Sequence, residues 1–303
     1  MSFSSEIKRE LCMLDDLKPC CKVAQIYGLS LFGCYFLDGR VYIKSESKEV
    51  CELFAQLSAE YMGFIADINS YYRNKNKLAY CAKLVYESDN LKFIKKFGHK
   101  SGEINLKINK TNFKDEDCIK AFIRGAFLIC SSVTDPNIEY RIEFKTKYLK
   151  LSEQFVDLIK SVEALNINPK ISNKKGYFIV YIKGAEAVSD VLTFLGAHNS
   201  AMNFIQVKML KEIRNNINRI NNFETANIDR TVKASVKQLN AIKFIDEKKG
   251  LDFLDEPLKK VAKVRMENPQ CSLNELCKLI PGISKSGLNH RLNKIVSISE
   301  KLK

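Results

Sequence analysis

The chain has 303 residues, of which 46% are hydrophobic. That length suits about two or three domains, each with its own core, and the composition excludes a disordered tail protein. The net charge of +14 favours a polyanionic partner, either nucleic acid or an anionic membrane surface. Residues 201–303 carry 20 Lys and Arg against 11 Asp and Glu, so nine of the net positive charges lie in the last third. We therefore expect the contact surface in that part of the chain.

The ten cysteines form no recognisable framework. Cys20 and Cys21 are adjacent and Cys271 and Cys277 are six residues apart, but no C-x-x-C pair with partnering histidines is present to build a zinc site. We expect most of them to be buried, reduced thiols of a cytoplasmic protein with no metal and no cofactor. The sequence shows no signal-peptide pattern and no apolar run of membrane-spanning length, so we expect no membrane partner.

The first two hundred residues contain an internal repeat. Residues 22–35 and 119–132 are apolar helix patterns that each carry a glycine, Gly28 in the first and Gly125 in the second. Each pattern is followed by a strand, an amphipathic helix, two strands and a closing helix. In the first copy these elements are predicted in that order at 40–44, 48–62, 64–72, 78–86 and 89–97, with a turn at 74–76 between the two later strands. In the second copy they are predicted at 139–145, 150–165, 169–172, 177–182 and 185–195. An interior glycine costs about 1 kcal/mol against alanine, so we expect the two glycine helices to pack closely at a pseudo-twofold axis.

Strand patterns end near residue 200 and basic helical patterns follow. A helix is predicted over residues 202–222, capped by Asn199 or Ser200, and after a break at 225–227 a second helix runs to about residue 245. Phosphate-contact candidates on these helices are Arg214, Arg219, Arg230 and Lys233. The alternative for each of them is a solvated or interdomain helix face.

The last forty residues predict two helices joined by a tight turn. Ser272 and Glu275 form a capping-box pattern, Gly282 follows Pro281 in the turn, and Ser284 can cap a second helix. That helix would bury Leu288, Leu292 and Ile295 and leave a polar, basic face, which is typical of a helix-turn-helix in the DNA major groove. Candidates for base or phosphate contacts are Ser284, Lys285, Ser286, Asn289, His290, Arg291 and Lys294. A helical hairpin with a merely solvated face is the alternative.

Two longer motifs carry a family resemblance. The glycine-bearing helices resemble a degenerate LAGLIDADG motif, the paired helices at the centre of homing endonucleases. The stretch Gly196–Ala234 (GAHNSAMNFIQVKMLKEIRNNINRINNFETANIDRTVKA) and the ending Ser284–Ile295 (SKSGLNHRLNKI) resemble the WhiA family of bacterial regulators. The resemblance covers essentially the whole chain.

The resemblance implies an α+β fold of two LAGLIDADG-like helix-strand-helix-strand-strand-helix units, followed by an all-α helix-turn-helix domain similar to region 4 of sigma factors. The expected domains are 1–200, with repeats at about 20–100 and 115–198, a basic helical connector at 201–247, and the DNA-binding domain at 248–303. The implied function is a transcriptional regulator of sporulation, or of cell division and chromosome segregation, that binds double-stranded DNA. Other regulators or RNA polymerase are further candidate partners.

We expect no enzymatic activity. Homing endonucleases end each motif in an acidic residue, and the two carboxylates hold divalent metal at the scissile phosphates. Aligning the glycines places Gly33 and Cys130 at those positions, and neither residue is a Mg²⁺ ligand. Asp38 and Asp135 follow a few residues later, where a turn-stabilising role is the ordinary one. No catalytic residues and no metal ligands are therefore predicted.

The N-terminal half could instead be a ligand-sensing or protein-docking module. Its predicted strands carry mixed charge, with Lys44 and Glu46 in the first repeat and Arg141, Glu143 and Lys145 in the second. On that pattern the strands do not form a uniformly basic face, and the sequence leaves open whether this half contacts DNA, a ligand or a protein.

Overall fold

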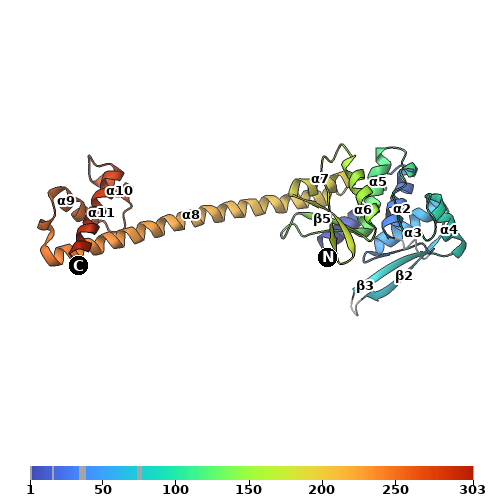
Figure 1. Cartoon of the computed structure of the whole chain (residues 1–303), viewed down its shortest axis with the longest axis horizontal. Coiled ribbons are helices and arrows are strands. Elements are labelled where there is room, and N and C mark those ends of the chain that lie inside the picture. The colour runs from blue at the N-terminus through green and yellow to red at the C-terminus, as the bar shows by residue number, and fades with distance from the viewer. Residues whose placement is uncertain (1, 16, 34–38, 74–76, 303) are drawn as a thin grey trace. The chain divides into compact units, whose positions relative to one another are not determined.

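The computed structural model describes residues 2–15, 17–33, 39–73 and 77–302. The predicted turn at 74–76 and Asp38 lie outside the described residues. The chain divides into two compact units, Met1–Lys211 and Glu212–Lys303. One continuous helix, α8 (His198–Lys249), contains the residues on both sides of that boundary (Figure 1). The domain boundaries expected from the sequence stay a prediction.

The first unit contains the predicted repeat twice, which confirms the α+β class. The first copy consists of α2 (Pro19–Gly33), β1 (Tyr42–Ser45), α3 (Lys48–Met62), β2 (Ala66–Arg73), β3 (Lys77–Leu84) and α4 (Glu87–Lys96). The second consists of α5 (Glu116–Cys130), β4 (Ser131–Val133), β5 (Arg141–Thr146), α6 (Leu149–Lys160), β6 (Lys170–Lys174), β7 (Tyr177–Lys183) and α7 (Ala185–Leu195). Helix α1 (Phe3–Cys12), the short strand β4 and a 3-10 turn, η2 (Lys110–Asn112), were not expected from the sequence.

The strands form two antiparallel sheets, in the orders β1-β3-β2 and β4-β5-β7-β6. In the first sheet Ile43 pairs with Ala82, and in the second Ile142 pairs with Ile182. All four side chains are buried in the core that contains the helices. Because neighbouring side chains of a strand point to opposite faces, each sheet has an apolar inner face and a second, outer face.

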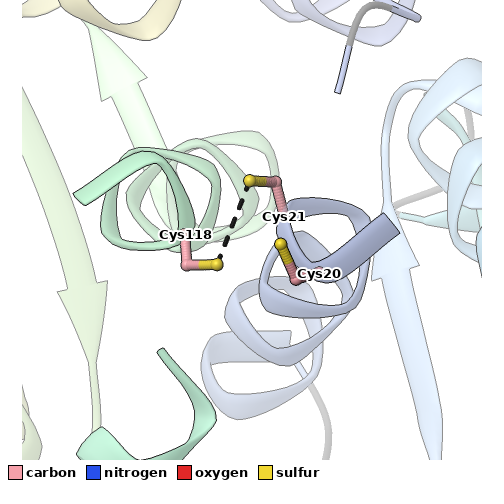
Figure 2. Close-up of side chains that lie close together, drawn as sticks. All are labelled: Cys20, Cys21 and Cys118. Atoms are coloured by element: carbon pink, nitrogen blue, oxygen red, sulfur yellow. Dashed lines mark hydrogen bonds between the residues drawn. The ribbon is translucent and has the colours of Figure 1, made fainter. Parts of the chain in front are cut away.

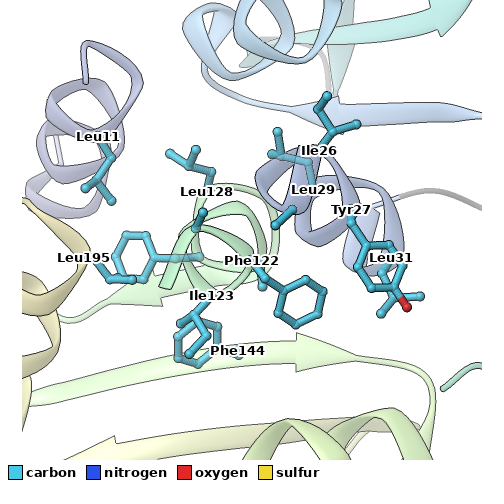
Figure 3. Packing of buried hydrophobic residues seen from close by; sticks show 14 of the residues in the cluster. Leu11, Ile26, Tyr27, Leu29, Leu31, Phe122, Ile123, Leu128, Phe144 and Leu195 are labelled. Carbon is cyan, nitrogen blue, oxygen red and sulfur yellow. The ribbon is translucent and has the colours of Figure 1, made fainter. Parts of the chain in front are cut away.

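Helices α2 and α5 pack backbone to backbone at the centre of this unit, as the repeat predicted. A Cβ atom on Gly28 would lie 2.1 Å from the carbonyl oxygen of Phe122, and one on Gly125 would lie 2.2 Å from that of Gln25. The reciprocal contacts identify the pseudo-twofold axis. Figure 3 shows the aromatic and aliphatic side chains around the pair, with Phe144 of β5 in the same cluster as Phe122 of α5. Only glycine permits this approach.

The start of α8 is capped differently from the prediction. Asn199 and Ser200 lie inside the helix, and their backbone N–H groups donate to the carboxylate of Glu10 at 2.7 and 2.9 Å. A residue of α1, nearly two hundred positions earlier, therefore satisfies the first free N–H groups of α8. The predicted break at 225–227 is also wrong, because α8 continues through it. Those residues include neither glycine nor proline, so nothing in them forces a helix to end.

The second unit is helical. Beyond α8 it contains a 3-10 turn, η3 (Leu251–Phe253), and the helices α9 (Glu256–Glu267), α10 (Leu273–Leu279) and α11 (Lys285–Lys301). Its core joins Ile242 and Ile245 at the end of α8 to Leu258, Leu276 and Leu288 of the three helices that follow. Within the described part of the chain, no helix is both long and apolar enough to span a membrane.

Candidate nucleic-acid interface

Helices α10 and α11 begin at the predicted residues and are held there by their caps. Ser272 Oγ accepts from the backbone N–H of Glu275, while the Glu275 carboxylate accepts from the backbone N–H of Ser272, which confirms the capping box. Ser284 Oγ accepts from Gly287 N–H at 3.2 Å and so caps α11. Gly282 supplies the turn with a φ of +84°, which side chains rarely adopt. Ser284 therefore has a structural role besides its predicted DNA contact.

The two faces of α11 separate as the spacing predicted. Leu288, Leu292 and Ile295 are fully buried. Arg291 lies at the edge of the other face and is partly buried. The exposed side chains of that face are Lys285, Ser286, Asn289, His290 and Lys294. Lysine can donate to base edges, and asparagine and histidine can donate or accept, so this face has the chemistry of a recognition helix.

Three of the four basic candidates on α8 lie on one side of the helix. An α-helix turns about 100° per residue, which puts Arg219 and Arg230 about 20° apart and Lys233 about 40° from Arg219. Arg214 lies about 140° from Arg219, on another side of the unbroken helix. All four side chains are exposed. Arg219, Arg230 and Lys233 therefore share one exposed face of α8, and Arg214 lies on another; contact of any of them with phosphate stays a prediction.

A hollow in the second unit brings candidates from both helices together. The pocket holds about 590 Å³ and is lined by Arg230 of α8 and Lys285 of α11, with Ser272 and Asn274 of α10 beside them. Arg265 of α9 lines the pocket as well, and Arg230 and Lys285 reach it from elements more than fifty residues apart in sequence. A single anionic group seated there would meet both, which the sequence did not indicate.

The two positions of the missing nuclease acids cannot hold magnesium. Gly33 has no side chain to ligate a metal, and a Cβ atom there would lie 2.6 Å from the side chain of Ile129, which would have to move for a larger residue. Burial raises the pKa of the Cys130 thiol to about 12, and its Sγ donates to the carbonyl of Ala126 at 3.1 Å. Asp135 is exposed and accepts from Asn137 N–H at 2.8 Å, which is the turn-stabilising role expected for it.

The outer sheet faces carry more cations than acids, although the predicted mixture of charges remains: Glu46, just beyond β1, lies 3.9 Å from Arg73, and Glu139 pairs with Lys183 at 3.2 Å. Pairing register separates inward from outward residues along each strand. The outward cations are Lys44, Arg73, Lys77, Lys83, Arg141, Lys145, Lys170, Lys174 and Lys183, against the outward acids Asp67 and Glu143. Glu143 is paired with Arg141 at 2.6 Å, so its charge is largely compensated. Successive side chains of a strand point to opposite faces of the sheet, and the lysines and arginines of these strands all lie on the outer face. A count of charges along the sequence does not show this.

The outer sheet faces meet at a pocket where α2 and α5 end. This pocket, of about 590 Å³, is lined by Gly33 and Cys130 together with Lys44, Lys145 and Tyr177. Lys44 and Lys145 occupy matching positions, each four residues before the helix that follows its strand. Lys145 Nζ lies 3.8 Å from the centre of the Tyr177 ring. Among the described residues neither lysine has an ion-pair partner, so both charges are available to an anion.

Spacing along the sequence also missed a cluster of thiols. The sulfur atoms of Cys20, Cys21 and Cys118 lie within 4.8 Å of one another, at the first turns of α2 and α5 (Figure 2). The nearest signal in the sequence is the repeat itself, because Cys21 and Cys118 each precede their motif glycine by seven residues. Figure 2 shows the three side chains converging from the two helices.

Comparison with known proteins agrees with both halves of this architecture. The family description "WhiA LAGLIDADG-like domain" matches residues 119–214, and "WhiA C-terminal HTH domain" matches residues 217–299. The chain is 36% identical to the "Probable cell division protein WhiA" of Thermoanaerobacter sp. (strain X514) over 323 aligned positions, covering 100% of this chain and 98% of the relative. It is 35% identical to the protein of that name from Clostridium acetobutylicum, covering 100% and 99%.

Among solved structures, the full-length WhiA of Thermotoga maritima matches with a TM-score of 0.59 and 24% identity, covering 99% of each chain. That likeness shows the fold. The N-terminal LAGLIDADG domain of WhiA, solved alone, matches with a TM-score of 0.50 and 19% identity over 64% of this chain and 92% of that one. With two curated relatives above 30% identity over its whole length, the chain belongs to the WhiA family.

Proposed function

We propose that the protein is a DNA-binding transcriptional regulator acting in sporulation, or in cell division and chromosome segregation. The observation that carries this proposal is the exposed polar face of α11, capped by Ser284 and backed by a packed core. Asn289 has the groups for a bidentate contact to adenine, and Arg291 or Lys294 for guanine or a phosphate. Lys285, Ser286 and His290 complete the face. Cytoplasmic, nucleoid-associated action on double-stranded DNA follows from this role.

The basic face of α8 supplies phosphate contacts. Arg219, Arg230 and Lys233 share one side of the helix, and Arg230 lines a hollow with Lys285. Contacts to phosphates position a protein on DNA without specifying sequence, whereas base contacts specify it. The exposed surface of the second unit also leaves room for other regulators or RNA polymerase as partners.

Replacing a side chain that contacts bases should affect DNA binding differently from replacing one that contacts phosphates. Replacing Asn289 with alanine should reduce the preference for a cognate site by about 1–3 kcal/mol and leave binding to unrelated DNA nearly unchanged. Replacing both Arg219 and Arg230 should weaken binding to all duplexes and lower the salt slope by about 1 for each phosphate that the variant no longer neutralises. Arg214→Ala is the matched control, because it removes one arginine from another side of the same helix. Fluorescence anisotropy at several salt concentrations measures all three.

We further propose that the first unit binds DNA phosphates or another polyanion without cutting it. Gly33 and Cys130 replace the metal-binding acids, and the pocket beside them is lined by Lys44 and Lys145. Fixed ammonium groups attract phosphate but do not activate water as a bound metal does. The specific alternative is that the same pocket senses a small anionic ligand, because its walls are basic and aromatic.

Plasmid cleavage tests the absence of nuclease activity. Extensively purified protein with Mg²⁺ or Mn²⁺ should leave supercoiled DNA intact. Metal-dependent cleavage that survives purification and disappears in Asp135→Ala would contradict the proposal. To separate the two roles of the pocket, anisotropy with non-specific duplex is compared between the wild type and a Lys44→Ala, Lys145→Ala variant. Unchanged duplex affinity together with abolished binding of a small phosphate compound would favour the ligand-sensing alternative.

A further inference from the structure

Three thiols meet at the end of the paired helices opposite to the pocket of Lys44 and Lys145. Cys20 and Cys21 lie in the first turn of α2, and Cys118 lies in the first turn of α5. Cys21 Sγ and Cys118 Sγ are 3.9 Å apart, and the three sulfur atoms all lie within 4.8 Å of one another (Figure 2). The cluster thus joins two elements almost a hundred residues apart at the pseudo-twofold axis.

The Cys21–Cys118 distance suits a tetrahedral metal centre. Zinc–sulfur bonds are about 2.3 Å long, so two sulfur ligands at a tetrahedral angle lie about 3.8 Å apart. The Cys21–Cys118 separation of 3.9 Å matches that value without movement of either helix. Thiolates select soft or borderline ions over Mg²⁺ and Ca²⁺. We propose that Cys20, Cys21 and Cys118 form a three-thiolate site for one thiophilic metal ion, Zn²⁺.

Charge around the cluster favours such a centre. Three thiolates and one Zn²⁺ carry a net charge of −1, and the positive ends of two helix dipoles converge there. Lys18 lies at the same end, but Asp117 at 2.8 Å and Asp115 at 3.9 Å offset its charge, so the two helix ends supply the positive potential. Cys21 and Cys118 are 1% and 0% exposed, whereas Cys20 is partly exposed. The ion can therefore enter beside Cys20, where water can take the fourth position.

A disulfide explains the cluster less well. Its sulfur atoms must close to about 2.05 Å, which requires the Cys21–Cys118 pair to move together and a two-electron oxidant to accept the electrons. It would also use two of the three sulfurs and leave the third without a role. Zinc coordination uses all three and requires only that the bound thiols release their protons.

The test uses the full-length chain, reduced with a phosphine and freed of metal by a chelator. Competition against a chromophoric zinc chelator should give one tightly bound Zn²⁺ per chain, and Cd²⁺ should produce the ultraviolet absorption of a metal–thiolate bond. Cys118→Ser and Cys20→Ser should each lower zinc affinity by at least about 100-fold, since even loss of an outer-shell partner costs 10–100-fold. Cys51→Ser, which changes a buried thiol in α3, is the matched control and should bind as the wild type does.

Cys20→Ser keeps the test informative if Cys118→Ser fails to fold, because Cys20 is the more exposed ligand. Circular dichroism checks that each variant keeps its helices. Any of three results would overturn the proposal: no stoichiometric zinc in the wild type, no cadmium–thiolate absorption, or equal affinity in Cys20→Ser and the wild type.

Discussion

Replacing Gly28 with alanine tests the packing at the pseudo-twofold axis. The new Cβ atom would lie 2.1 Å from the Phe122 carbonyl oxygen and 2.9 Å from Ala126 N, where ordinary contact begins near 3.4 Å. The α2 and α5 backbones would have to separate by about 1.3 Å, and no side-chain rotation can relieve the clash because both atoms are backbone. Overpacking costs about 1–3 kcal/mol, against a gain of about 1 kcal/mol in helix propensity.

We expect a net loss of about 2 kcal/mol in the free energy of unfolding, because the obstructing atoms are rigid. Tyrosine fluorescence isolates the relevant unit: the chain has 12 tyrosines and no tryptophan, and every tyrosine precedes residue 212. In urea the tyrosine transition should move down by about 1 M. Gly125→Ala, at the matching position, should behave alike.

The control is Gly287→Ala in α11, where the nearest atom to a new Cβ is Ser284 Oγ at 3.3 Å, a mild side-chain contact beside the backbone clash at Gly28. Unfolding followed by circular dichroism should show that Gly287→Ala leaves the stability unchanged or raises it slightly, since alanine has the higher helix propensity. A Gly28→Ala protein as stable as the wild type would refute the close approach of the two helices.

Three further outcomes follow from named contacts. Lys44→Ala with Lys145→Ala should weaken non-specific duplex binding and flatten its salt dependence, whereas Lys160→Ala, an exposed lysine at the end of α6, should not; anisotropy distinguishes them. Glu10→Ala should lower the stability of the first unit by about 0.5–2 kcal/mol by uncapping α8, and an unchanged tyrosine transition would exclude that cap. The backbone N–H of Ser272 lowers the pKa of Glu275, so the advantage of glutamate over glutamine there should exist above the ordinary glutamate pKa and vanish as pH falls through the lowered one. Dichroism-monitored unfolding of Glu275→Gln across pH checks this sign.

Local patterns were sufficient for most of the fold. Period-two and helical spacing located nearly every strand and helix of both repeats, and the interior glycines predicted the central helix pair, because these signals lie within a few residues of one another. The caps of α10 and α11 were predictable for the same reason, since each joins residues three positions apart. Features that depend on residues far apart in the sequence could not be predicted in this way. Glu10 caps α8 from almost two hundred residues away, which no local pattern encodes.

The candidate sites divide in the same way. The exposed face of α11 followed from helical spacing alone, because a single element sets which side chains are buried. The basic outer sheet faces required strand register, which decides the side on which each lysine lies. The continuity of α8 changed which arginines share a face, since one unbroken helix fixes their angles. The thiol cluster required both the repeat and the packing of its two copies.

Selection from a random duplex pool tests the central claim most directly. Full-length protein at near-physiological salt is used to enrich bound sequences, and the enrichment is repeated with Asn289→Ala, Arg291→Ala protein. We predict that the wild type enriches one common motif and that the variant fails to enrich it while still binding unselected duplex through its basic surfaces. Enrichment of the same motif by the variant, or no motif with the wild type, would contradict sequence recognition by α11.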